Sequence, residues 1–125
     1  MQKKISDKVI VRFGSKEVKA HLADSFLKRA IGLSCRKGLP ENEGMLFVFP
    51  RPRRAAFWNL AMRFPVDVIW ISGSRIIGIA KNIPAVSAGI KIFSPPAKID
   101  YVLEIPAGLA DKLDISVGNP VEITK

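Results

Sequence analysis

The sequence has one cysteine and one histidine, Cys35 and His21, among 125 residues. A single cysteine excludes an intramolecular disulfide and a thiolate zinc site, and a single histidine excludes every two-histidine metal site. No apolar run approaches the ~20 residues that a membrane-spanning helix needs. The N-terminus has Asp7, Lys8 and Arg12 where a signal peptide has an apolar core. We therefore expect a cytoplasmic protein with no bound metal and no membrane partner.

Sequence signatures of nucleotide binding and of serine or cysteine hydrolases are also missing. The stretch GSKEVKAH lacks the Gly-Lys-Ser/Thr end of a P-loop, and no G-x-G-x-x-G precedes an expected helix. A serine triad would need His21, which we expect on the solvent face of a strand. Cys35 lies beside Arg36 and Lys37, which could lower its pKa, but no base is expected nearby. We expect no cofactor, and the chain has no recognisable catalytic motif; a role other than catalysis is favoured.

Charge of one sign is in excess. The net charge is +9, and residues 1–37 hold ten Lys/Arg against three Asp/Glu, which gives +7 for that part. An uneven positive field favours anionic partners such as nucleic acid or phosphorylated ligands. It also aids solubility, and the abundant Ile and Lys with few Asn, Gln and Cys are typical of a protein from a thermophile. Composition leaves both explanations open.

Short apolar runs between Gly and Pro turns predict a single domain over residues 1–125. We expect strands near residues 9–13, 17–22, 45–49, 66–72, 75–81, 90–93, 99–105 and 121–124, and short helices near 25–31 and 108–113. Gly14-Ser15 and Gly73-Ser74 are two-residue hairpin turns with glycine first. The fold class is mainly β: a compact antiparallel β-barrel or sandwich of about eight short strands with two short peripheral helices.

Two acids lie in apolar strands. Asp67 follows Phe64-Pro65-Val66, where desolvation would raise its pKa unless Arg63, Arg36 or backbone donors stabilise the charge. It could bind a ligand, act in catalysis or fix a turn by accepting backbone N–H bonds. Glu104, in YVLEIPAG, must face solvent or have a partner. Trp58 and Asn59 could wall a small pocket, although packing in the core is favoured for this tryptophan.

These residues support three hypotheses. The first is a site for a small polar or anionic ligand, or for a protein partner, formed by Arg36, Trp58, Asn59, Asp67 and Glu104. The alternative is a nucleic-acid-binding module that uses Lys28, Arg29, Arg36, Lys37, Arg51, Arg53 and Arg54. Single-strand binders interleave such charges with exposed aromatic residues, but here the aromatic residues lie inside apolar runs. The third hypothesis is a hydrolase with Asp67 and Glu104 as acid and base, which requires the two to be close.

Five segments occur in order along the chain: GLSCRKGLPENEGMLFVFP, AFW, RFPVDVIWI, YVLEIPAG and VGNPVEI. Their order and spacing resemble the domain of unknown function 192 family over about residues 16–124. The family's usual core reads approximately F-W-M-K-N-T-x-x-P-L-D. Phe57, Trp58, Pro65 and Asp67 match it, while residues 59–62 read NLAM instead of M-K-N-T. Further matching positions are Arg36, Gly44, Met45, Phe47, Phe49 and Glu104. The resemblance implies a β-rich single domain and no established reaction.

Overall fold

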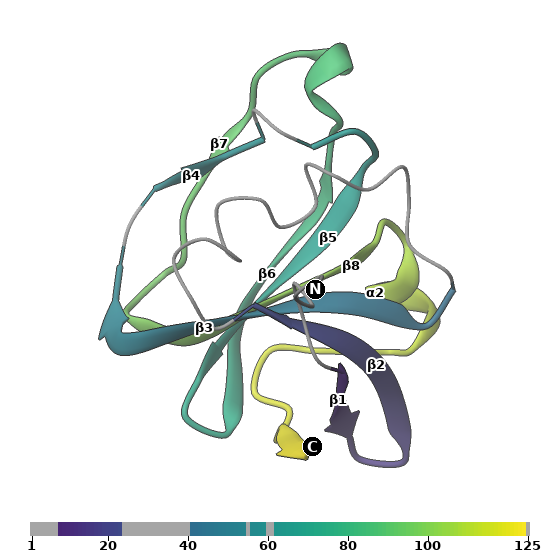
Figure 1. Cartoon of the computed structure of the whole chain (residues 1–125), viewed down its shortest axis with the longest axis vertical. Coiled ribbons are helices and arrows are strands. Elements are labelled where there is room, and N and C mark those ends of the chain that lie inside the picture. Colours follow the sequence, from purple (N-terminus) through teal and green to yellow (C-terminus); the bar gives the residue numbers. More distant parts are fainter. Residues whose placement is uncertain (1–7, 24–40, 55, 60–61, 125) are drawn as a thin grey trace, which may run out of the picture.

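The protein is described by a computed structural model that covers residues 8–23, 41–54, 56–59 and 62–124. Seven strands form one curled, half-barrel sheet in the order β6-β5-β8-β3-β2-β1-β9, and β4 pairs with β7 in a second, small sheet (Figure 1). The elements are β1 (Lys8–Phe13), β2 (Lys16–Ala23), β3 (Glu43–Arg53), β4 (Phe57–Trp58), β5 (Val66–Ser72), β6 (Arg75–Ile83), the 3₁₀ turn η2 (Val86–Ala88), β7 (Ile92–Phe93), β8 (Ile99–Pro106), the helix α2 (Leu109–Lys112) and β9 (Glu122–Thr124). The mainly β prediction is confirmed.

Both hairpins predicted from glycine turns are present. β1 pairs with β2, and β5 pairs with β6, each antiparallel. Gly14 and Gly73 have φ of 64° and 60°, whereas Ser15 and Ser74 are not among the residues with positive φ. Glycine is therefore needed only at the first turn position, as in the turn type that the sequence suggested.

The expectation of a wholly antiparallel sheet with two helices needs correction. β2 and β3 run parallel, with Lys19 opposite Glu43 and Leu22 opposite Leu46. A parallel pair needs a long crossover connection, and residues 24–42 are long enough to provide one. α2 is the one α-helix among the described residues, and the helix expected near 25–31 lies outside them.

The sheet curls until its first and last strands approach each other. Ile76 N, in β6, donates to Asn119 O (3.0 Å), and Val121 N donates to Ser74 O (2.7 Å). An isolated bridge joins Arg75 to Pro120 at the same place. This corner resembles a barrel, although the sheet as a whole is a half-barrel.

Apolar residues bury both faces of the central strands. On one face Leu46, Ile69 and Leu103 pack in a cluster that includes Leu109 and Ala110 of α2. On the other face, which we call the flap face, the cluster contains Met45, Val68, Trp70, Val102 and Phe93. The β4–β7 sheet and its connections (residues 56–59 and 84–93), hereafter the flap, cover part of this face. The rings of Phe57 and Phe93 lie 5.5 and 5.9 Å from that of Trp70. The two apolar runs at 45–49 and 66–71 form strands, as predicted, and both faces of these strands are covered.

Candidate functional site

One row of paired residues crosses the flap face of the sheet. His21 of β2 lies opposite Met45 of β3, Met45 lies opposite Glu104 of β8, and Glu104 lies opposite Val68 of β5. Directly paired residues project from the same face, and neighbouring strands are ~4.8 Å apart. Glu104 is thus an acid between two apolar side chains, with a histidine two strands away.

The carboxyl group of Glu104 is the most unusual group among the described residues. Its side chain projects among Met45, Val68 and Val102, and only 9% of the residue is exposed. No hydrogen bond or ion pair to the Glu104 side chain is found among the described residues, although its oxygens are not among the fully buried polar atoms that lack a partner. Burial raises the pKa of Glu104 from 4.5 to about 8, because an ionised carboxylate loses its hydration in this surrounding. At neutral pH the group is mainly a neutral acid that can donate a hydrogen bond.

His21 forms a second polar feature on the same row. Its Nε2 lies 3.0 Å from Oε1 of Glu43, and its side chain is 15% exposed. The expectation that His21 points to solvent is therefore wrong. His21 lies on the face of the sheet that carries Met45 of β3, and there its ring meets the carboxylate of Glu43, which the strand alternation of β3 places on the same face. The hydrogen bond to His21 is the main cause that lowers the pKa of Glu43.

Asp67 belongs to the opposite face. It lies opposite Ile105, whereas its neighbour Val68 lies opposite Glu104. Its carboxyl oxygens accept hydrogen bonds from the backbone N–H groups of Asn82 (2.9 Å), Gly108 (3.0 Å) and Ala110 (3.1 Å). These bonds tie β5 to the end of β6 and to the start of α2, which is the turn-fixing role. The structure therefore does not bring Asp67 and Glu104 together.

Asn59 and Trp58 also have different environments. Asn59 is fully buried: its Nδ2 donates to Pro84 O (2.7 Å) and Gly89 O (2.9 Å), and its Oδ1 accepts from Lys91 N (2.8 Å). Trp58 is 53% exposed, so core packing was the wrong expectation for it. Successive residues of a strand point to opposite faces, and Phe57 takes the inward position.

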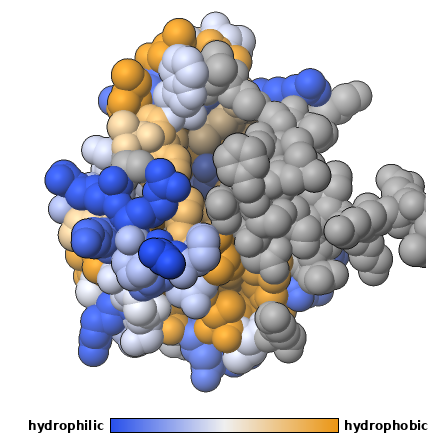
Figure 2. Space-filling view, turned by 60° about the vertical axis from the view of Figure 1, so that its left-hand side comes forward, coloured by the Kyte–Doolittle hydropathy of each residue, from blue (hydrophilic) through white to orange (hydrophobic). Residues whose placement is uncertain are grey.

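The predicted basic residues fall into two groups. Arg51 and Arg53 at the end of β3, and Arg54 just after it, are exposed. Arg54 Nε donates to Pro95 O (3.0 Å), and the guanidinium of Arg53 lies 5.7 Å from the ring centre of Phe49. Figure 2 turns this side of the molecule forward and shows hydrophilic side chains beside an apolar strip. Lys28, Arg29, Arg36 and Lys37 lie outside the described residues.

The sequence indicated Glu104 as a candidate but did not predict its neighbours in the fold. It also did not predict that Glu104 and His21 lie on the same row of the sheet. The alternation of YVLEI puts Val102 and Glu104 on one face, which is a readable signal. The partners Met45 and Val68 depend on strand register, which no local pattern gives. In the part of the chain that the structure describes, no group of three His, Cys, Asp or Glu could hold a metal ion, and no helix is long and apolar enough to cross a membrane.

Curated relatives come from thermophilic archaea. A UPF0127 protein of Thermococcus kodakarensis is 32% identical over 108 residues, which cover 85% of this chain and 65% of the relative. One of Thermococcus gammatolerans is 32% identical over 100 residues, covering 78% of this chain and 61% of the relative. The chain thus spans less than two-thirds of the length of these two proteins. One of Pyrococcus horikoshii is 29% identical over 109 residues, covering 85% of this chain and 88% of the relative.

Two solved structures share the fold. A Sinorhizobium meliloti protein, described as a candidate transcription regulator, has a TM-score of 0.85 and 27% identity and covers 97% of both chains. A protein of unknown function from Novosphingobium aromaticivorans has a TM-score of 0.77 and 30% identity, over 92% of this chain and 83% of that chain. The family model described as "Uncharacterized ACR" matches residues 9–123. The chain therefore belongs to the domain of unknown function 192 family, as its five ordered segments indicated.

Proposed function

We propose that the protein binds a small molecule on the flap face, with the polar group of the ligand at Glu104. The observation that supports this most is a carboxyl group, 9% exposed, with no hydrogen-bond partner among the described residues. A carboxyl group that has lost most of its hydration without gaining a hydrogen-bond partner is unfavourable, and such a group in a native protein calls for an explanation. A ligand atom that hydrogen-bonds to Glu104 would remove that cost.

The surroundings of Glu104 define the class of ligand. Met45, Val68 and Val102 surround Glu104 with apolar side chains and are themselves at most 2% exposed, so a ligand head at Glu104 would enter apolar surroundings and the body next to it should be apolar. The neutral acid can donate to an acceptor, and an anionic head group such as a carboxylate is the strongest acceptor. The proposed ligand is therefore a small molecule with an apolar body and a neutral or anionic hydrogen-bonding head.

The other two hypotheses have less support. Acid and base must act on one substrate, and Asp67 and Glu104 project from opposite faces of the sheet. For nucleic acid, the described arginines are exposed, but the nearest exposed aromatic residue, Trp58, pairs with an isoleucine, Ile92, and not with a second stacking ring. Nucleic-acid binding is therefore one of the alternative outcomes of the vesicle experiment described in the next subsection.

A thermal-shift experiment tests the ligand proposal. Hexanoate and phenylacetate, their amides, and hexylamine would be titrated against the unsubstituted protein and against Glu104→Leu at pH 6 and pH 9. The acids or amides should raise the melting temperature at pH 6, because a ligand that binds the folded state stabilises it. The shift given by the acids should shrink at pH 9, where an ionised Glu104 repels them.

The controls separate this site from general effects. Glu104→Leu should abolish the shift, and Glu122→Gln, at an exposed position of β9, should preserve it. Equal shifts with Glu104→Leu and the unsubstituted protein would mean that the probes bind elsewhere. A shift from hexylamine alone would contradict the proposed ligand class.

A further inference from the structure

The outer side of the flap exposes three large apolar side chains. Trp58 is 53% exposed, Ile90 is 65% exposed and Ile92 is 66% exposed. Trp58 and Ile92 are directly paired across the small sheet and therefore project from the same side. The inner side holds the other pair, Phe57 and Phe93, whose rings stack at 6.1 Å. We call Trp58, Ile90 and Ile92 the flap patch.

The flap patch is held in place from inside by Asn59. The side chain of Asn59 makes one hydrogen bond to the backbone of Lys91, between the two isoleucines, and another to the backbone of Gly89, next to Ile90. Asn59 N also donates to Lys91 O at 3.2 Å. The backbone that carries the two exposed isoleucines is therefore held by hydrogen bonds to a buried side chain.

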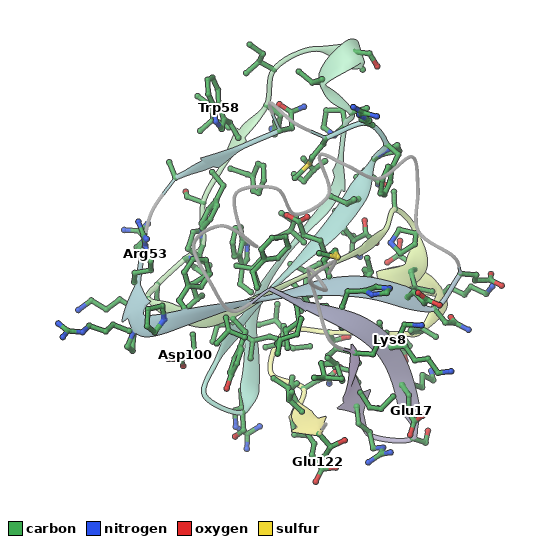
Figure 3. The ribbon with its side chains drawn as sticks, viewed as in Figure 1. Lys8, Glu17, Arg53, Trp58, Asp100 and Glu122 are labelled. Atoms are coloured by element: carbon green, nitrogen blue, oxygen red, sulfur yellow. The ribbon has the colours of Figure 1, made fainter. Side chains whose placement is uncertain are left out.

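The chain segment that carries the flap patch is almost free of acidic residues. Between Glu43 and Asp100 the only acid in the sequence is Asp67, which is 1% exposed and held by backbone N–H groups. Exposed basic residues in the same range include Lys91 within the patch and Arg54, which binds Pro95 O just beyond β7. Figure 3 shows Trp58 and Arg53 on the same side of the molecule, at its left-hand edge in that view.

We propose that the flap patch docks on the surface of a lipid bilayer that contains anionic lipids. Trp58, Ile90 and Ile92 would enter the interface between headgroups and acyl chains, where tryptophan is preferred. Lys91 and the arginines at the end of β3 would lie against anionic headgroups. A peripheral contact needs no spanning segment, so this proposal replaces the expectation of no membrane partner, which depended only on the lack of such a segment.

Other partners fit the flap patch less well. A second copy of the chain would bring like charges together around the patch. A stable protein interface buries about 800 Å² on each partner with 20 to 30 residues, whereas the patch consists of three side chains, two of them on two-residue strands and Ile90 just before β7. Single-stranded nucleic acid would use the cations and Trp58, but the two exposed isoleucines offer bases no stacking surface.

The experiment uses vesicles of phosphatidylcholine and phosphatidylglycerol at a 3:1 ratio, with pure phosphatidylcholine vesicles for comparison. Co-sedimentation of the unsubstituted protein should be at least tenfold stronger with the anionic vesicles and should weaken with salt. Trp58 should shift its fluorescence to shorter wavelength on binding. Trp70 is 2% exposed and should contribute no change, which a Trp70→Phe variant checks if it folds.

The chain offers a matched control for the flap patch. Val117 is 62% exposed in the turn before β9, away from the flap. The double substitution Ile90→Ser, Ile92→Ser should reduce vesicle binding at least tenfold, whereas Val117→Ser should leave it unchanged. Equal losses from both variants, or no binding to anionic vesicles, would overturn the proposal. It would also be overturned if a single-stranded oligonucleotide quenched Trp58 while vesicles left its fluorescence unaltered. None of these results bears on the Glu104 site, which a separate assay tests.

Discussion

Replacing Glu104 with glutamine should change how the stability of the protein depends on pH. The pKa of Glu104 is 4.5 in the unfolded chain and about 8 in the folded protein, because burial disfavours the charged form. Between these values the folded state holds a proton that the unfolded state releases. Stability should therefore fall as pH rises through this window, by about 1.4 kcal/mol per pH unit. Below pH 4.5 and above pH 8 the contribution of this group is constant.

The expected size is large compared with the net stability of a small domain. From pH 5 to pH 9, Glu104 should lower the free energy of unfolding by about 4 kcal/mol, against a typical total of 5–15 kcal/mol. Glutamine has nearly the same shape and cannot ionise. In Glu104→Gln this loss should disappear, while the contributions of all other groups remain.

Urea unfolding of both proteins at one-unit intervals from pH 5 to pH 9 measures the difference. The two stability curves should diverge below pH 8, with the unsubstituted protein gaining relative stability as the pH falls. Glu43→Gln is the matched control on the same face. The pKa of Glu43 is lowered, so its contribution is lost only as pH falls below the unfolded value, and its curve should run parallel above pH 5. Parallel curves for Glu104→Gln and the unsubstituted protein would refute the reasoning that Glu104 is a neutral buried acid.

Three further substitutions test the structural assignments. Asn59→Ala should cost about 2–4 kcal/mol in urea unfolding, because it leaves backbone groups of the flap without partners, and a cost under 1 kcal/mol would deny Asn59 this role. Asp67→Ala should cost about 3 kcal/mol or more through the loss of its three backbone hydrogen bonds; near-neutral unfolding would contradict the turn-fixing role. Gly44→Ala would place Cβ 2.6 Å from the carbonyl oxygen of Glu104 and should cost about 1–3 kcal/mol. A melting temperature unchanged by Gly44→Ala would show that β3 and β8 are less tightly packed than described.

Local patterns in the sequence were enough for much of the fold. Glycine-first turns predicted both hairpins, since few other residues adopt a positive φ at Gly14 and Gly73. Short apolar runs between turns predicted strands at 45–49 and 66–72, and both are present. The parallel pairing of β2 with β3 was missed, because the partner of a strand across a long connection leaves no local signal.

For the site residues, too, the sequence predicted the local feature but not the tertiary neighbours. The sequence identified Asp67, Glu104, Trp58 and Asn59 as unusual, because a polar residue in an apolar run or an aromatic residue at a strand end is visible locally. It placed them in one site, whereas the structure puts Asp67 and Glu104 on opposite faces of the sheet, since strand alternation and pairing decide which face each side chain meets. Arg36 lies outside the described residues, and its part in the site stays a prediction.

What the sequence determined by itself was the type of element at each place, because turns and buried strands depend on residues that are neighbours in the chain. Only the tertiary structure decided that Glu104 has apolar neighbours, that Asp67 lies on the other face and that Trp58 points outward. The neighbours of each of these groups come from strands that are distant in sequence. These neighbours determine whether an acid is charged and whether a side chain is exposed to a ligand or partner.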